Sequence, residues 1–267
     1  MTTRDELRKY QDFKFDDDLN NSSISIGDNQ SYFVYKQHKE YLPYIGDLYG
    51  SKYPKILLVL ESHYLDPIDR DNVQNLLMSK FNSNEVERLE YFANSWYFNQ
   101  NNSWNEFESM ILSKHFFDTR SVILDVMEGK NNNVVILDTL KAFDEAINPN
   151  NKGSIMQIRQ SIRNFAFMNF FQRPEIITGK EIKPTEVDKI IACRNFDNVF
   201  NILNPEKVVF VSRGAYKVYE KSNKEVLLNE NIISVAQPGS PNFNMENKNN
   251  RKHLISNFKK WTSKLTK

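Results

Sequence analysis

The residues best suited to chemistry stand at the end of an aliphatic run. Glu61, Ser62, His63 and Tyr64 directly follow Lys55–Leu60, which reads Lys-Ile-Leu-Leu-Val-Leu. A short, continuous aliphatic run bounded by polar residues predicts a strand buried on both faces, as in parallel sheets. A carboxylate at the end of such a strand can position water or stabilise a developing cation. The alternative is that Glu61 only caps the next helix.

A second candidate is Asn169, which interrupts the apolar run Phe165–Phe171. A buried amide must find hydrogen-bond partners, because leaving it unsatisfied costs ~1–3 kcal/mol. An Asn amide both donates and accepts, so it can match an adjacent N–H and C=O pair on a ligand. A structural hydrogen bond to a neighbouring loop explains the residue equally well. Phe170, beside it, either lines a pocket or belongs to the core.

These residues need a sheet to position them. Two more strands are expected at Lys207–Ser212 and Asn231–Ala236, with a capped helix beginning after Thr185. Alternating strands and helices predict a three-layer α/β/α fold around a short, mainly four-stranded parallel sheet. Ligands in such sheets bind outside the carboxyl ends of the strands. Four segments are therefore expected to converge there: Glu61–Tyr64, Asn169–Arg173, Ser212–Gly214 and Gln237–Pro241.

The chain divides into two parts in this interpretation. Residues 1–30 are polar and predict a short helix followed by a loop. Residues 31–267 form one α/β domain, in which residues 41–49 are irregular because Pro43 and Gly46 interrupt them. A helical insertion covers about residues 68–148. It serves either as a lid or as an oligomer interface, and the sequence does not choose between these roles or define the oligomeric state.

Composition narrows the class of protein. The 267 residues include 35 basic and 34 acidic ones, so the net charge does not indicate a polyanionic partner such as nucleic acid. Cys193 is the single cysteine, and neither a signal peptide nor a membrane-length apolar run is present, which predicts a soluble cytoplasmic protein. The four histidines are scattered and no glycine-rich phosphate loop occurs. We therefore expect no metal site and no cofactor.

Basic residues gather near the carboxyl terminus, where Glu246 is the one acid among them after residue 245. A lysine-rich helix face is commonly just solvated, but it can also supply salt-sensitive contacts to phosphates. Charge asymmetry with the acidic amino-terminal run Asp16–Asp18 favours nucleic acid. The expected contacts to a nucleic-acid backbone are Arg213, Lys252 and Lys259.

The convergent segments, in their order along the chain, resemble the uracil-DNA glycosylase superfamily of DNA repair enzymes. The resemblance covers about residues 40–245. The segments that carry it are Ile56–Tyr64, Phe167–Phe170, Val208–Ala215 and Ala236–Pro241, together with Pro43–Tyr49, which is similar to a bacterial branch.

The resemblance implies a protein that binds a flipped or single-stranded DNA base and hydrolyses its N-glycosidic bond. It assigns catalysis to Glu61 and Gln237. A flipped base is stacked on aromatic rings and read along its pairing edge. The pocket residues implied are Ser62, His63, Tyr64, Asn169, Phe170 and Ser240.

Two departures from the family pattern affect this function. The usual catalytic Asp, two residues before the Tyr, is Ser62 here, and Glu61 stands one position earlier. Gln237 replaces the usual His, and an amide donates a hydrogen bond to a leaving group but supplies no proton. The alternative is therefore a non-catalytic module on the same fold that binds nucleic acid, a nucleotide or another partner.

Overall fold

A computed structural model gives the structure of this protein. It describes residues 8–26, 30–62, 65–81, 84–98, 106–107, 109–112, 118–150, 153–176, 182–223, 231–235 and 243–263, with the backbone alone for residue 30 and residues 243–250.

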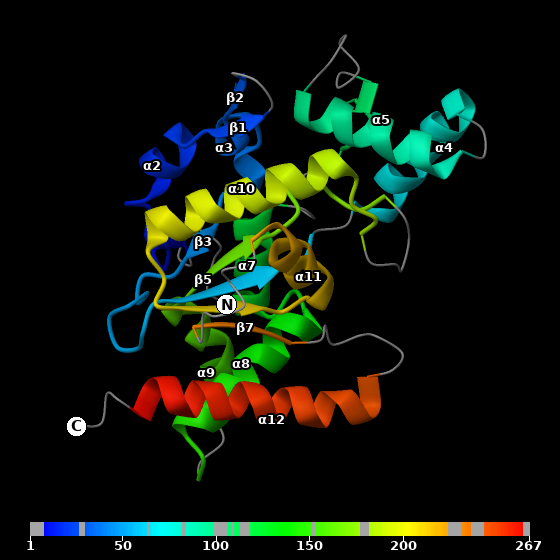
Figure 1. Ribbon diagram of the computed structural model, residues 1–267. Coiled ribbons are helices and arrows are strands. Elements are labelled where there is room, and N and C mark those ends of the chain that lie inside the picture. The colour runs from blue at the N-terminus through cyan, green and yellow to red at the C-terminus, as the bar shows by residue number, and fades with distance from the viewer. Residues whose placement is uncertain are drawn as a thin grey trace.

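The centre of the molecule is a five-stranded sheet in the order β3-β5-β4-β6-β7 (Figure 1). Strands β5, β4, β6 and β7 run parallel to one another, as the sequence predicts, and β3 pairs antiparallel with β5. The strands are β3 (Tyr44–Ile45), β4 (Ile56–Leu60), β5 (Phe165–Asn169), β6 (Lys207–Phe210) and β7 (Ile232–Ser234).

Strand β3 corrects the expectation that residues 41–49 are irregular throughout. Tyr44 and Ile45 pair with Phe167 and Ala166 of β5, and both side chains are buried. Pro43, which has no backbone N–H, precedes the strand, and Gly46 continues the contact with β5 by donating to the Phe165 carbonyl over 2.9 Å. The pairing partner, β5, lies more than a hundred residues away along the chain, so no local sequence pattern predicts strand β3.

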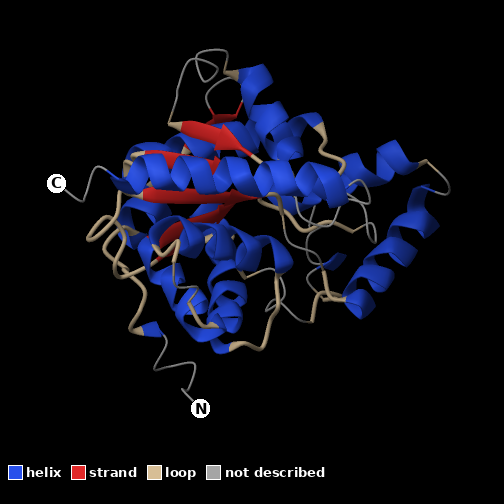
Figure 2. Ribbon diagram, turned by 90° about the horizontal axis from the view of Figure 1, so that it is seen from below, coloured by secondary structure: helices blue, strands red, loops and turns tan. Residues whose placement is uncertain are grey.

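Helices cover both faces of the sheet, as Figure 2 shows with red strands between blue helices. On one face Leu57 and Val59 pack with α5, α10 and α11, and on the other Ile56 and Leu58 pack with α7, α8 and α12. This alternation is that of a strand buried on both sides. The helices are α4 (Pro67–Phe81), α5 (Glu85–Phe98), α7 (Thr119–Glu128), α8 (Val134–Ile147), α9 (Ile155–Gln160), α10 (Glu186–Leu203), α11 (Arg213–Ser222) and α12 (Phe243–Thr262).

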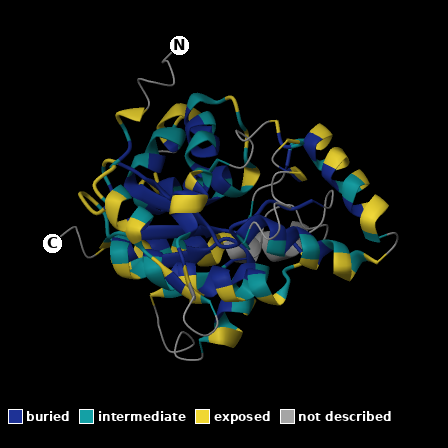
Figure 3. Cartoon of the chain, turned by 90° about the horizontal axis from the view of Figure 1, so that it is seen from above, coloured by how far each residue is buried: buried dark blue, intermediate teal, exposed yellow. Residues whose placement is uncertain are grey.

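Where the structure describes residues 68–148, it places four long helices there, and these helices differ in their surroundings. Helices α7 and α8 form part of the layer that covers the sheet. Helices α4 and α5 lie at the periphery, where their outer faces are exposed (Figure 3). Both follow the carboxyl end of β4, so they stand beyond the edge at which the predicted site lies.

The amino-terminal region contains more regular structure than a helix and a loop. Helix α2 (Asp16–Asn21) is followed by a hairpin of β1 (Ile24–Ile26) and β2 (Gln30–Tyr32), which corrects the predicted loop. The hairpin is stabilised by tertiary packing, because Ile24 and Tyr32 are buried against the core. Two short elements follow it, α3 (Val34–Gln37) and the 3₁₀ helix η1 (Lys39–Tyr41), and a second 3₁₀ helix, η4 (Ser161–Asn164), precedes β5.

Helix α10 begins and ends as its sequence indicates. Thr185 and Asp188 form a reciprocal capping box at its first turn, and Asn204 ends it in the left-handed conformation with φ of 45°. Among the helices that the structure describes, none combines the length and the apolar character needed to cross a membrane.

Candidate functional site

Polar residues follow three adjacent parallel strands at the carboxyl edge of the sheet. Glu61 comes directly after β4, Asn169 is the last residue of β5, and Ser212 stands two residues after β6. The path of the chain reverses here, because β4 leads to β5 on one side and β6 leads to β7 on the other. The boundary between β4 and β6 is thus the topological switch point, and open α/β sheets bind their ligands at such points.

Glu61 lies at the amino terminus of α11. Its side chain is buried, with 6% of the residue exposed. A Cβ added to Gly214 would stand 3.2 Å from Oε1 of Glu61 and 3.6 Å from Oγ of Ser212, so the glycine leaves room for the carboxylate. Ser212 caps the helix by accepting a hydrogen bond from the Ala215 amide over 3.1 Å. The positive end of a helix dipole favours a negative charge at this position.

Asn169 is fully buried, and only one of the two polar atoms of its side-chain amide has a hydrogen-bond partner. Nδ2 donates a hydrogen bond to Oγ1 of Thr119, at the start of α7, over 3.1 Å. Oδ1 is buried and has no hydrogen-bond partner within the structure. Nδ2 carries a second hydrogen, so an acceptor and a donor remain for a ligand. The structure thus shows the structural hydrogen bond, and the role of Asn169 in binding a ligand stays a prediction.

Glu61 and Asn169 project on opposite faces of the sheet. Leu60 pairs with Asn169 in the parallel register, so these two side chains share a face and Glu61, the next residue, turns to the other. The contacts agree, because Asn169 reaches Thr119 in α7 and Glu61 reaches Gly214 in α11. A ligand that touches both must lie across the carboxyl edge of the sheet, beyond the ends of β4 and β5.

Phe170 belongs to the aromatic core. It is fully buried and packs against Phe171, Phe210 and Tyr219 at ring-centroid distances of 5.0, 5.8 and 6.4 Å. Its amide donates to the Leu60 carbonyl over 2.9 Å, which extends the contact between β5 and β4 past the end of the strand. These contacts favour the core interpretation of this residue over stacking on a base.

A second buried amide follows Asn169. The Gln172 side-chain amide donates to the backbone carbonyls of Asn169 and Phe170, and the backbone carbonyl of Gln172 accepts from the Trp96 indole over 2.9 Å. Oε1 of Gln172 is buried without a partner, as is Oδ1 of Asn169. The sequence analysis missed Gln172 and Thr119. A glutamine directly after a buried Phe-rich strand is the one signal that could have pointed to Gln172.

A buried ion pair fixes the loop that continues from Gln172. Arg173 and Asp188 are fully buried, and two N–H groups of Arg173 reach the two carboxylate oxygens over 2.8 and 2.9 Å. Burial disfavours the charge on Arg173, but the Asp188 carboxylate more than offsets this effect and the pKa of Arg173 lies above its usual value. Tyr97 also donates to Asp188, over 3.1 Å. The loop after β5 is therefore tied to the start of α10.

The three expected phosphate contacts are exposed but separated. Arg213 is the first residue of α11 and precedes Gly214, the residue that faces the Glu61 carboxylate. Lys252 and Lys259 lie on α12, whose packed residue Trp261 stands 5.6 Å beneath Nζ of Lys207 at the start of β6. Lys259 is thus near the amino edge of the sheet. Arg213 is the one of the three placed at the carboxyl edge.

The remaining predicted residues are placed as follows. Ser62 is half-buried and directly follows Glu61. His63, Tyr64, Gln237 and Ser240 lie outside the residues that the structure describes. Among the residues described, no group of three or more His, Cys, Asp or Glu side chains is arranged to hold a metal ion.

The fold and the edge of the sheet define the protein as a mixed α/β protein with a five-stranded, mainly parallel sheet flanked by helices. No family model, curated protein or solved structure matches the chain.

Proposed function

We propose that this protein is a uracil-DNA glycosylase-like protein that binds an extruded or single-stranded base at the carboxyl edge of its sheet and hydrolyses the N-glycosidic bond. The observation that carries the proposal is the Asn169 amide, buried at the end of a central strand with Oδ1 unpartnered. A buried acceptor without a donor costs about 1–3 kcal/mol. A base that presents an N–H to Oδ1 recovers this cost.

In this mechanism Thr119 holds the amide in one orientation. Its hydroxyl engages Nδ2, so Oδ1 faces the ligand and the second amide hydrogen can pair with an acceptor next to the N–H. A neighbouring N–H and C=O is the pattern of a pyrimidine or purine pairing edge. The amide thereby selects the base, and it does so before any bond is broken.

Glu61 supplies the negative charge that stabilises the sugar cation in this mechanism. Hydrolysis of an N-glycosidic bond passes through an oxocarbenium-like sugar, which a nearby carboxylate stabilises while water attacks. The amino terminus of α11 places partial positive charge beside the Glu61 carboxylate, and Gly214 leaves room for this side chain. Gln237 donates to the departing base, whose negative charge a positioned donor stabilises. Ser62, His63, Tyr64 and Ser240 border the base in this proposal.

A non-catalytic binding module is the second candidate, and one observation favours it. The Glu61 side chain is almost fully buried and is held at the amino terminus of α11, so its carboxylate already has a structural role. Together with the Ser62 and Gln237 departures from the family pattern, this role supports recognition of a base without hydrolysis. Asn169 would serve the same purpose in both candidates.

The test is a base-release assay on single- and double-stranded oligonucleotides that carry uracil, hypoxanthine, xanthine or modified cytosines, with binding measured at two salt concentrations. We expect release by the wild type, loss of release in Glu61→Gln with binding retained, and loss of both in Asn169→Ala. Asn198→Ala is the matched control, because Asn198 also makes one side-chain hydrogen bond, to the Ser23 carbonyl, away from the carboxyl edge.

The outcomes separate the candidates. Salt-sensitive binding that needs Asn169, without release of any base, establishes the binding module. If neither binding nor release depends on Asn169 and Glu61, the site is wrong and only the α/β fold stands.

A further inference from the structure

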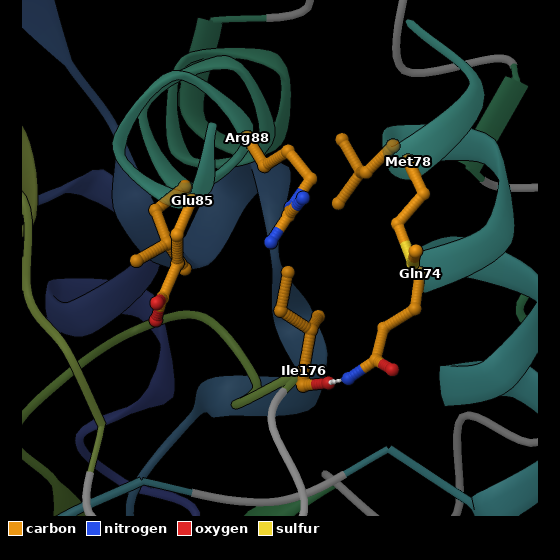
Figure 4. Close-up of a pocket in the computed structure, with 7 residues that line it drawn as sticks. Gln74, Met78, Glu85, Arg88 and Ile176 are labelled. Carbon is orange, nitrogen blue, oxygen red and sulfur yellow. Dashed lines mark hydrogen bonds between the residues drawn. The ribbon is translucent and has the colours of Figure 1, made fainter. Parts of the chain in front are cut away.

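A cleft of about 410 Å³ opens at the amino edge of the sheet, away from the predicted base site at the carboxyl edge. Its walls come from the segment that precedes β4, from the end of α8, from α9 and from η4, which precedes β5. The volume lies within the range of about 300–1,000 Å³ that is typical of small-molecule sites. The cavity between α4 and α5, at about 200 Å³, lies below that range, and Figure 4 shows that Gln74 in its wall already donates to the Ile176 carbonyl.

The carboxylate of Asp144 lies in the wall of this cleft, and its hydrogen bonds come from neutral donors. Asp144 is only 7% exposed. Oδ1 accepts from the side-chain amide of Asn148 and Oδ2 from the backbone amide of Gly153, each over 2.9 Å. Within the part of the chain that the structure describes, no cationic group pairs with this carboxylate.

This combination leaves Asp144 suited to a positively charged ligand. A buried charge is costly unless it is both hydrogen-bonded and paired with an opposite charge. Asp144 meets the first condition but not the second. Each carboxylate oxygen can accept more than one hydrogen bond, so both oxygens keep capacity for a donor that enters from the cleft.

A positive charge without an ion pair lines the same cleft. Lys52 is exposed at the rim, and in the described structure its ammonium meets the face of Tyr53, with Nζ 5.2 Å from the ring centroid, and no carboxylate. Arg163, the other cationic residue of the wall, is already balanced by Asp47 over 2.9 and 2.6 Å. Lys52 and Asp144 therefore give the cleft one unpaired charge of each sign.

The remaining wall includes an apolar surface. The side chains of Tyr53 and Ile147 line the cleft and are half-buried. The Tyr53 ring is held by an edge-to-face contact with the buried ring of Phe143, at a centroid distance of 5.0 Å. An aliphatic group of a ligand can pack against this surface, which supplies apolar burial beside the two charges.

We propose that this cleft binds a small zwitterion with an aliphatic side chain, in which an ammonium group pairs with Asp144, a carboxylate pairs with Lys52, and the side chain packs against Tyr53 and Ile147. A free amino acid and a short peptide share this chemistry. The cleft lies at the edge of the sheet opposite to Asn169, so this proposal does not depend on the proposed function.

The experiment is calorimetric titration of the full chain with L-leucine, glycyl-L-leucine, N-acetyl-L-leucine and L-leucinamide. We expect L-leucine or glycyl-L-leucine to bind, and the tighter of the two distinguishes a free amino acid from a peptide. N-acetyl-L-leucine, which lacks the ammonium group, should bind at least about tenfold more weakly than L-leucine, because hydrogen bonds to a buried charged group are strong. L-leucinamide, which lacks the carboxylate, should lose only about two- to fivefold, because an ion pair with an exposed lysine contributes little.

Two variants assign these preferences to their residues. Asp144→Asn should make L-leucine bind as weakly as N-acetyl-L-leucine. Asp138→Asn is its matched control, because it removes a negative charge from the same helix at a residue that pairs with Lys141 and does not line the cleft.

Lys52→Met replaces an exposed side chain, so it tests the site in a folded protein even if Asp144→Asn is destabilised. It should abolish the difference between L-leucine and L-leucinamide. Lys36→Met is the matched control, since Lys36 is also an exposed lysine over an aromatic ring, with Nζ 5.6 Å from the Phe33 centroid, and lies outside the cleft.

Several results would overturn the proposal. They are the absence of binding by both L-leucine and glycyl-L-leucine, equal affinities for L-leucine and N-acetyl-L-leucine in the wild type, and preferences that survive Asp144→Asn or Lys52→Met. Equal losses in these variants and in their matched controls would overturn it as well.

Discussion

The side chain of Asn169 donates a hydrogen bond to Thr119, 50 residues earlier in the chain, and both residues are fully buried. The bond joins the end of β5 to the first turn of α7, and it leaves Oδ1 of Asn169 as a buried acceptor without a partner. A side chain that is fixed on one side and open on the other is suited to recognition, because its orientation is settled before the ligand binds.

Thr119→Val tests this relationship with almost no change in volume. We expect the free energy of unfolding to fall by about 1–3 kcal/mol, because the Asn169 amide loses its buried partner. Binding of a base-containing oligonucleotide should weaken at the same time. Thr139→Val is the matched control, since the buried Thr139 hydroxyl donates only to the Val135 carbonyl of its own helix. Urea unfolding and oligonucleotide binding measure both effects, and equal losses in the two variants would contradict the special role of Thr119.

Gly214→Ala is expected to separate stability from activity. Alanine favours a helix over glycine by up to about 1 kcal/mol, so the fold should be as stable as before or slightly more stable. The added Cβ, 3.2 Å from Oε1 of Glu61, should displace the carboxylate and reduce base release. Comparing Gly214→Ala with Glu61→Gln and with the double variant gives the coupling between the two residues. Strictly additive losses would show that Gly214 does not act through Glu61.

The Arg173–Asp188 pair should be the costliest ion pair to break. Arg173→Met leaves a fully buried carboxylate without its cation, for which the expected loss is about 3–5 kcal/mol in the free energy of unfolding. Lys189→Met removes one partner of the exposed pair with Glu186, and such pairs are worth at most about 1 kcal/mol. Denaturant unfolding of the two variants measures the contrast. Similar small losses would mean that water reaches Asp188.

Asp197→Asn predicts a pH dependence of stability. Burial raises the pKa of Asp197, although the hydrogen bond that Tyr219 donates over 2.8 Å opposes this. A raised pKa in the folded state means that the stabilisation is complete below the unfolded value, near 3.9, and is lost as the pH rises through the folded value. The asparagine variant has no such loss. Its stability relative to the wild type should therefore increase from about pH 3 to about pH 7, the range over which a carboxyl group with a raised pKa titrates.

The measurement for Asp197 is urea unfolding of both proteins across that range. Asp17→Asn, which alters an exposed carboxylate of α2, controls for the general effect of removing one negative charge. A relative stability that stays constant with pH, or that falls as the pH rises, would contradict the prediction.

Local patterns in the sequence were enough to find the four parallel strands of the sheet. The runs at Ile56–Leu60, Phe165–Asn169, Lys207–Phe210 and Ile232–Ser234 are short and apolar between polar boundaries, which is typical of strands covered on both faces. The capping box at Thr185 and the stop at Asn204 were equally local signals. Alternation of strands with helices then determined that the sheet is mainly parallel, and that Glu61 and Asn169 stand at its carboxyl edge.

Only the tertiary structure decided how these parts meet. The order β3-β5-β4-β6-β7, the antiparallel strand β3 and the partners Thr119 and Gly214 depend on contacts between distant residues. The register of β4 against β5 also decided that Glu61 and Asn169 turn to opposite faces. A one-residue shift would reverse this arrangement, because side chains alternate along a strand. The packing of both faces sets that register, and packing is a property of the folded chain as a whole.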